Sequence, residues 1–282
     1  QPLHRAINHF HADQYRPYAD RLTPVAGIPL HSPQEGIEEL EFAVKTLGLK
    51  VINIAGGVRR PIRAIAEKYP AAEHPEIAKQ VGYIDFYGID SEHDYDPFWA
   101  KVVELGVPVT THYGSQGWTG RQSISNYMNN HIGHFADGSQ AFAKALFFGG
   151  VTRRFPGLRV AIEHAGLPWD RSESGLAHWR RGMQALAALP EVMVKLSEFG
   201  LPDAPWSANS NVRVVRETVE IFGAGRCMFA SNLPVSGLRA PMAEVVRAVA
   251  EGLDGLDDAA RDAVWRGNAL RFYRIDPAGP GR

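Results

Sequence analysis

Cysteine is nearly absent from this sequence of 282 residues, which contains only Cys227. An intrachain disulfide and a cysteine-based zinc site are therefore both excluded. Neither sign of charge is in excess, because the sequence has 30 Lys and Arg and 31 Asp and Glu, for a net charge of −1. No basic surplus is present to attract nucleic acid or an anionic membrane, so we expect neither as a partner.

Long apolar segments are absent too. The longest runs, such as residues 141–150, fall well below the ~20 residues that a membrane span needs. Residues 1–20 lack the apolar core of a signal peptide. The 45% hydrophobic and 22% charged residues are typical of a soluble enzyme, and we expect a cytoplasmic one. The first residue is Gln1 rather than Met, which indicates a processed start or a fragment.

Seven short apolar runs recur along the chain, each with the length of a buried parallel strand. Helical spacing of apolar residues separates most of them, as between Ile37 and Leu47. The repeated unit is therefore strand, loop, helix. The runs are residues 24–30, 50–55, 82–89, 107–112, 158–164, 191–197 and 227–231.

This alternation predicts a parallel sheet covered by helices, either an open doubly wound sheet or a closed (β/α)8 barrel. No GxGxxG or GxxxxGK[ST] motif follows a strand, so a nucleotide-binding open sheet has no support. We predict a (β/α)8 TIM-barrel-like fold whose first strand is absent from this chain. One domain is expected over residues 1–276, with residues 277–282 as a flexible tail.

Two histidines end predicted strands of this barrel. His112 follows Val-Pro-Val-Thr-Thr and His164 follows Val-Ala-Ile-Glu. The active site of such a barrel lies at the carboxyl ends of its strands. A neutral imidazole there can ligate a metal or accept a proton near neutral pH. Because the two positions are equivalent, we predict a functional role over a merely structural one.

Several segments of the chain resemble one enzyme family. They are Val-Thr-Thr-His112, residues 151–169, Val194-Lys-Leu-Ser197, Arg226-Cys-Met-Phe-Ala-Ser-Asn-Leu-Pro234 and Gly267-Asn-Ala-Leu-Arg-Phe-Tyr273. Together they resemble the amidohydrolase-related branch of the amidohydrolase superfamily, over nearly the whole chain. The resemblance implies a distorted (β/α)8 barrel. It also implies an activity among the metal-dependent hydrolases, sugar lactonases and nonoxidative decarboxylases.

The resemblance further implies roles for single residues. His112 would ligate a divalent metal, Zn or Mn, and His164 would bind that metal or polarise the substrate. Asn232 falls where most members place an aspartate that binds the metal and shuttles a proton. An amide forms hydrogen bonds but cannot act as a base, so this position departs from the family pattern.

The first strand of the family, which carries His-x-His, is a second departure. His9 and His11 have this spacing, but Leu3, Ile7 and Phe10 recur at helical intervals. On a helix, residues two apart point to different faces, so His9 and His11 could not share a metal. We favour the helix; a ligand pair on a first strand is the alternative.

Three further residues are predicted to bind substrate. Arg121 and His134 lie in residues 113–139, which we predict to be a loop insertion that covers the site and holds a carboxylate. A scaffold or an oligomer contact is the alternative for this segment. Lys195 ends the seventh strand of the predicted barrel, the run 191–197, and faces the mouth of the barrel, unless a salt bridge to Glu198 or Glu163 holds it.

These residues predict a metal-dependent hydrolase acting on a small carboxylated or lactone substrate. In this hypothesis His112 holds the metal, His164 polarises the carbonyl and Asn232 orients water or substrate. A nonoxidative decarboxylase and an inactive, incomplete barrel are the alternatives. The expected partner is a small-molecule substrate, and a homodimer is consistent with the resemblance.

Overall fold

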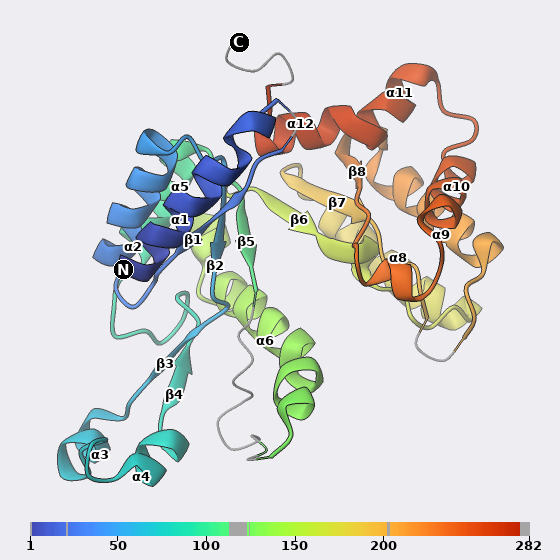
Figure 1. Ribbon diagram of the computed structural model, residues 1–282. Coiled ribbons are helices and arrows are strands. Elements are labelled where there is room, and N and C mark those ends of the chain that lie inside the picture. The colour runs from blue at the N-terminus through green and yellow to red at the C-terminus, as the bar shows by residue number, and fades with distance from the viewer. Residues whose placement is uncertain (1, 21, 113–122, 124, 202–203, 277–282) are drawn as a thin grey trace. The chain divides into compact units, whose positions relative to one another are not determined.

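The computed structural model describes residues 2–20, 22–112, 123, 125–201 and 204–276 (Figure 1). The chain divides into two compact units, Gln1–Leu158 and Arg159–Arg282. The single domain over residues 1–276 stays a prediction. The predicted tail, residues 277–282, lies outside the described residues.

The first unit contains a parallel sheet in the order β1-β2-β5 (Figure 1). Val25 pairs with Val51, and Ile52 pairs with Val109. The buried core on this sheet includes Ile52, which is not exposed to solvent at all. The strands are β1 (Val25–Ile28), β2 (Val51–Ile54) and β5 (Val109–Thr111), and the helices are α1 (Pro2–Tyr15), α2 (Pro33–Glu41), α5 (Asp96–Leu105), α6 (Tyr127–Phe148) and α7 (Val151–Arg154).

An antiparallel hairpin projects from this unit. Strand β3 (Val58–Arg60) pairs with β4 (Tyr83–Asp85), and α3 (Arg63–Lys68) and α4 (Pro75–Gln80) lie between them in the chain. The prediction of a buried parallel strand over residues 82–89 is therefore wrong. An apolar run indicates a strand but not the direction of its partner, and Val-Arg-Arg is too charged to be noticed as that partner.

A buried charge network fixes the base of the hairpin. Arg60 donates from Nε to Oδ2 of Asp85 at 2.6 Å and from Nη2 to the Tyr95 hydroxyl at 2.8 Å. Tyr95 donates in turn to the carbonyl oxygen of Leu30, just past β1, at 2.7 Å. Burial raises the pKa of Tyr95 to about 12, so the hydroxyl keeps its proton. The hairpin is thereby joined to the carboxyl end of β1.

The second unit contains another parallel sheet, in the order β6-β7-β8. Along β7, Val192, Val194 and Leu196 are buried against the core, whereas Met193 and Lys195 point to the opposite face. The strands are β6 (Val160–Ile162), β7 (Val192–Leu196) and β8 (Cys227–Phe229), and the helices are α8 (Glu173–Ala187), α9 (Ala208–Phe222), α10 (Met242–Gly252), α11 (Asp258–Asp262) and α12 (Asn268–Tyr273).

Helices therefore alternate with parallel strands in both units, which confirms the predicted mixed α/β class. The absence of a first strand stays a prediction. Among the described residues, no helix is both long and apolar enough to cross a membrane. The loop predicted over residues 113–139 is wrong in its second part, because α6 begins at Tyr127, where Asn126 accepts a hydrogen bond from the Asn129 backbone at 2.9 Å.

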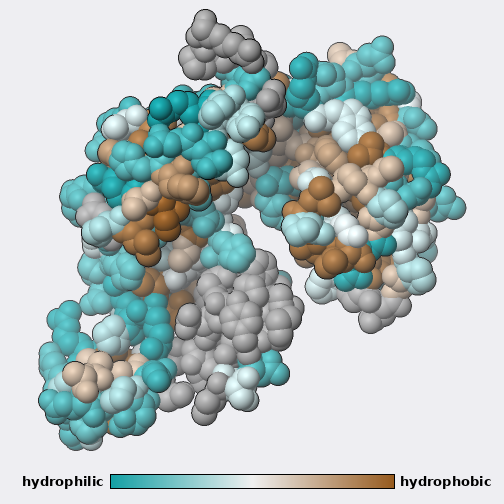
Figure 2. All heavy atoms as spheres, viewed as in Figure 1, coloured by the Kyte–Doolittle hydropathy of each residue, from teal (hydrophilic) through white to brown (hydrophobic). Residues whose placement is uncertain are grey.

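Helix α1 confirms that His9 and His11 lie on a helix. Its apolar face is nevertheless exposed: Leu3, Ile7 and Phe10 are 70%, 41% and 63% accessible. Figure 2 shows apolar side chains gathered over this helix. The periodicity predicts the helix correctly, but the face that packs inward carries a polar side chain.

That inward side chain is Asn8, which joins α1 to β1. Its Nδ2 donates to the Gly27 carbonyl oxygen at 2.9 Å, and its Oδ1 accepts from the Gly27 backbone N–H at 2.8 Å. Nδ2 also donates to Glu39 Oε1 at 2.9 Å, while Arg5 Nε donates to Glu39 Oε2 at 2.7 Å. Asn8 and Glu39 are both 0% exposed, so these bonds form away from water. The Asn8 amide thus pairs with β1 as a neighbouring strand would.

Replacing Asn8 should loosen this edge of the sheet. Asn8→Ala leaves the backbone of Gly27 and the Glu39 carboxylate short of partners, at about 1–3 kcal/mol for each buried group. We expect faster hydrogen–deuterium exchange in residues 25–28. Gln14→Ala, at an exposed position of the same helix, is the control. Equal exchange in the two variants would show that the Asn8 bonds do not hold β1.

Candidate active site

Three residues with left-handed backbones follow the three strands of the second unit. They are His164 (φ 58°), Glu198 (φ 47°) and Asn232 (φ 49°), just beyond β6, β7 and β8 respectively. Residues other than glycine rarely adopt positive φ, and each costs of order 1–3 kcal/mol. Parallel strands bring their carboxyl ends to one edge of a sheet. Strain at three neighbouring strand ends marks this edge as the candidate active site.

His164 begins a left-handed turn of unusual length. Ala165, Gly166 and Leu167 also have positive φ, at 50°, 70° and 48°. The turn is closed by the backbone N–H of Leu167, which donates to the carbonyl oxygen of His164 at 2.9 Å. Left-handed residues normally occur singly in proteins. The chain therefore holds the His164 ring in place against a backbone preference.

The His164 ring is fixed by Ser197. Nδ1 of His164 lies 2.8 Å from the Ser197 Oγ. The ring nitrogen that does not face Ser197 is Nε2. Burial lowers the pKa of His164, although the nearby carboxylates of Glu163 and Glu198 oppose that shift. The ring is therefore neutral at pH 7. A neutral imidazole whose Nδ1 is occupied can act as a base through Nε2.

A serine next to a histidine is also the arrangement that activates a serine nucleophile. Ser197 is only 1% exposed, however. A nucleophile has to contact its substrate, and this hydroxyl lies beneath the surface. We therefore assign Ser197 the task of orienting the imidazole ring.

Asn232 and Glu198 form the second contact of the site. Asn232 Nδ2 donates to Glu198 Oε2 at 2.5 Å, and Ser236 Oγ donates to the same oxygen at 3.1 Å. Arg239 Nε lies 3.7 Å from Glu198 Oε1, and the Glu198 side chain is 12% exposed. Glu198 was not predicted as a site residue from the sequence, although it follows the run 191–197 directly. A search for polar residues one step beyond each run would have found it.

Lys195 is paired inside the protein. Its Nζ donates to Glu163 Oε1 at 2.8 Å and lies 5.7 Å from the centre of the Tyr273 ring. Burial alone would lower the pKa of Lys195, but Glu163 and Tyr273 raise it on balance. The salt bridge considered from the sequence is therefore present, and substrate binding by Lys195 stays a prediction.

The remaining predicted residues lie in the first unit. His112 follows β5, and its backbone N–H donates to the Ile54 carbonyl oxygen at 3.2 Å. Its predicted role as a metal ligand together with His164 stays a prediction, because the two lie in different units. Arg121 lies outside the described residues. His134 belongs to α6 rather than to a loop, and its predicted contact with substrate stays a prediction.

The donors of the second unit do not by themselves fit a divalent metal. A catalytic zinc site usually has three protein ligands. Within the part of the chain that the structure describes, no group of three or more His, Cys, Asp or Glu side chains is placed to hold a metal. The predicted Zn or Mn stays a prediction.

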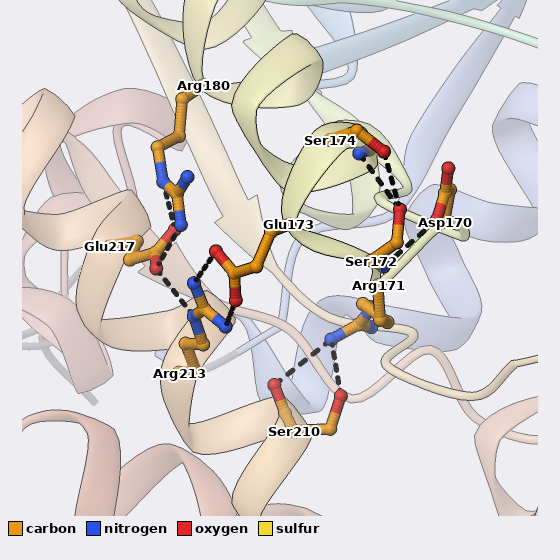
Figure 3. Close-up of polar contacts among 10 residues, drawn as sticks. Asp170, Arg171, Ser172, Glu173, Ser174, Arg180, Ser210, Arg213 and Glu217 are labelled. Atoms are coloured by element: carbon orange, nitrogen blue, oxygen red, sulfur yellow. Dashed lines mark hydrogen bonds and ion pairs between the residues drawn. The ribbon is translucent and has the colours of Figure 1, made fainter.

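Arg171 ties the loop after His164 to the neighbouring strand end and helix. Its guanidinium donates to the carbonyl oxygens of Pro168 at 2.5 Å, Ser210 at 3.1 Å and Phe199 at 3.5 Å, and to Ser210 Oγ at 3.3 Å. Figure 3 shows its contact with Ser210 at the start of α9. Burial lowers the pKa of Arg171, since backbone oxygens replace water around the cation.

An ion-pair network lies beside Arg171 (Figure 3). Glu217 on α9 accepts from Arg180 and from Arg213, each at 2.8 Å, and Arg213 also binds Glu173 at 2.6 Å. These contacts join α8 to α9. The side chains of Arg213 and Glu173 are 41% and 77% exposed, and a pair as exposed as this contributes about 0–1 kcal/mol. The network therefore provides matched controls for the more buried Arg171.

Removing the Arg171 guanidinium should loosen the turn that carries His164. In Arg171→Met the carbonyl oxygens of Pro168, Phe199 and Ser210 lose a donor. We expect faster hydrogen–deuterium exchange across residues 164–171. Arg213→Met removes an exposed arginine from the adjacent network and should leave that segment unchanged. Similar exchange in both variants would refute the assignment of Arg171.

The pKa of His164 can be measured directly. We expect its imidazole to titrate below the ordinary value of 6.5, because burial disfavours the charged form. Below pH 6.5 the unfolded chain takes up this proton first, so stability should fall as the pH drops from 6.5 to the folded pKa. Histidine NMR signals, with His164→Gln for assignment and urea-unfolded protein as reference, provide the test. Titration at or above 6.5 would contradict it.

Parallel strands alternating with helices, with polar side chains at the carboxyl ends of the strands, are typical of the barrel-type α/β enzymes. A family model described as "Amidohydrolase" matches residues 1–275. The chain therefore belongs to this amidohydrolase family, which confirms the resemblance found in the sequence.

Curated relatives match this chain in part. The uncharacterized protein y4mH of Sinorhizobium fredii is 33% identical over 44% of this chain and 42% of its own length. The L-fucono-1,5-lactonase of Burkholderia multivorans is 36% identical over 42% of this chain and 44% of its own length. Each of these matches therefore spans less than half of the relative. The gamma-resorcylate decarboxylase of Rhodococcus jostii is 22% identical over 96% of this chain and 76% of its own length.

Solved structures confirm the TIM-barrel type of fold. A 5-carboxyvanillate decarboxylase from Sphingomonas paucimobilis has a TM-score of 0.62 at 16% identity, covering 97% of this chain and 73% of that one. A 2,6-dihydroxybenzoate decarboxylase from Rhizobium has a TM-score of 0.58 at 20% identity, covering 96% and 77%. A dihydroxybenzoic acid decarboxylase from Polaromonas was solved with bound manganese. At such identities the likeness concerns the fold alone.

Proposed function

We propose that this protein hydrolyses a small lactone or a related carboxylic ester. The observation that carries the proposal is the partly buried ring of His164 just beyond β6, whose Nδ1 lies 2.8 Å from Ser197 Oγ. Burial lowers the pKa of this ring, which favours its neutral form. Such a ring suits a general base and lies at the strand edge where a barrel enzyme binds its substrate.

The reaction divides into two proton transfers at Nε2 of His164. Nε2 takes a proton from water while the water oxygen attacks the lactone carbonyl carbon. The ring oxygen then leaves with the proton returned by His164, and the product is the open hydroxy acid. Asn232, held by Glu198, orients the water or the substrate. One lactone and one water are consumed for each hydroxy acid formed.

The relatives support a sugar-acid lactone as substrate class. The Burkholderia multivorans relative at 36% identity is named an L-fucono-1,5-lactonase. A 1,5-lactone of a sugar acid is therefore the first compound to assay. A small-molecule lactone is the partner that the proposed function requires. The metal-dependent route through His112, the homodimer and the cytoplasmic location stay predictions.

Nonoxidative decarboxylation is the second candidate, because the gamma-resorcylate decarboxylase match covers 96% of this chain. That reaction needs an acid that protonates the carbon from which CO₂ leaves. His164 is mostly unprotonated at pH 7, because burial lowers its pKa, so it seldom carries the proton that this step consumes. The electrostatics of the site therefore favour hydrolysis.

Substitution of His164 tests the proposed function. His164→Gln should lower kcat/KM for L-fucono-1,5-lactone by roughly 10²–10⁴-fold, as expected for loss of a general base. His178→Gln, at an exposed histidine of α8, is the control. Activity of the unaltered protein should fall as the pH drops through the lowered pKa of His164.

The assay follows acid release with a pH indicator, corrected for spontaneous lactone opening. Parallel measurement of CO₂ release from 2,6-dihydroxybenzoate covers the alternative. Release of CO₂ with no lactone opening would replace hydrolysis by decarboxylation. Undiminished hydrolysis in His164→Gln would remove His164 from the mechanism.

A further inference from the structure

We propose that Glu198 is the positioning residue of this site, and that it forms with Asn232 a carboxylate–amide pair whose two members can be exchanged. The pair fixes which end of the Asn232 amide faces the reacting groups. This role rests on the proposed function for its effect on rate, but not for the contact that orients the Asn232 amide.

The orientation of the amide follows from the chemistry of the contact. An ionised carboxylate only accepts hydrogen bonds. Asn232 therefore meets Glu198 through Nδ2, at 2.5 Å from Oε2. The amide oxygen consequently points away from Glu198, where it can accept a hydrogen bond from water or a substrate hydroxyl. An amide without a charged neighbour would lack this preference.

The carboxylate itself is held from two sides. Ser236 Oγ donates to Oε2 at 3.1 Å, and Arg239 Nε lies 3.7 Å from Oε1. With its side chain 12% exposed, Glu198 is largely removed from water, so its charge is weakly screened. The charged groups that act on His164 are Glu163, Glu198 and Lys195. Glu163 and Lys195 already pair with each other, at 2.8 Å.

Backbone strain is the second, independent observation. Asparagine tolerates a left-handed backbone, whereas glutamate has no such tendency. Glu198 nevertheless has φ 47° and faces Asn232, which has φ 49°. A left-handed glutamate at one strand end, joined by a hydrogen bond to the residue at the next strand end, is typical of a position held for function. A hydrogen bond that only joined two loops would not require this backbone strain at Glu198.

The test exchanges the two members. Glu198→Gln removes the charge and the fixed acceptor, and Asn232→Asp puts two carboxylates in contact. Each should lower kcat for lactone opening by roughly 10- to 100-fold, since a small misplacement near the reacting atoms has effects of this size. The double variant Glu198→Gln/Asn232→Asp restores one donor facing one carboxylate. We expect it to recover at least tenfold over either single variant.

The side-chain amide signal of Asn232 in the NMR spectrum, assigned with Asn232→Asp, is the second readout and needs no substrate. Glu198→Gln should shift this signal, because the amide loses the charged acceptor at Oε2. Glu173→Gln is the matched control, because it removes one negative charge from a side chain that is 77% exposed, and it should leave the signal unchanged. Glu198→Asp retains the charge and covers the case in which a single variant does not fold.

The outcomes separate this proposal from the proposed function. If the Asn232 amide signal shifts in Glu198→Gln as expected while no variant and no unaltered protein opens lactones, the function is wrong and the pair stands. If lactone opening depends on His164 but Glu198→Gln keeps full kcat, Glu198 is not a positioning residue. If the loss of kcat in the double variant equals the product of the losses in the two single variants, the two residues act independently. That result would also refute the proposed pair.

Discussion

Parallel pairing of β6, β7 and β8 is the constraint on which the candidate active site depends. Ile162 lies opposite Val194, and Leu196 lies opposite Phe229. This register places the residues that follow each strand at one level, so His164 reaches Ser197 across 33 positions of sequence. A shift of one residue would turn each of these side chains to the other face of the sheet. The core beneath the sheet therefore determines which polar groups can meet.

The strained strand ends exist because neighbouring contacts leave them no alternative. The turn after β6 is closed by its own backbone hydrogen bond, and Trp179 of α8 donates to the Ala165 carbonyl oxygen at 2.8 Å. Arg171 extends this support to Phe199 and to the first turn of α9. Left-handed residues persist only where the surroundings determine them this fully. Helix packing in the second unit is thus part of the site and not only of its stability.

The sequence predicts the strands and their polar ends better than it predicts the partners of those ends. His164 is found because it ends an apolar run, and Asn232 because the family resemblance places it at the position of an aspartate. Glu198 and Arg171 are missed, because their importance lies in contacts across 34 and 39 positions that no local pattern contains. Strand β3 is missed for a similar reason, since only its antiparallel partner makes Val-Arg-Arg a strand. Periodicity finds α1 but does not find its inward contact, which is the amide of Asn8.

The contact between Glu198 and Asn232 also explains why an amide at position 232 suits this chain. An aspartate there would place a second carboxylate against Oε2 of Glu198, and like charges in contact raise the cost of ionising both. An amide gives a donor to the same oxygen and leaves one negative charge near the neutral ring of His164. That charge is suited to stabilise the imidazolium that forms when His164 takes a proton. Asn232 and Glu198 are therefore best understood as one unit, in which the residue at one strand end determines which residue the next can carry.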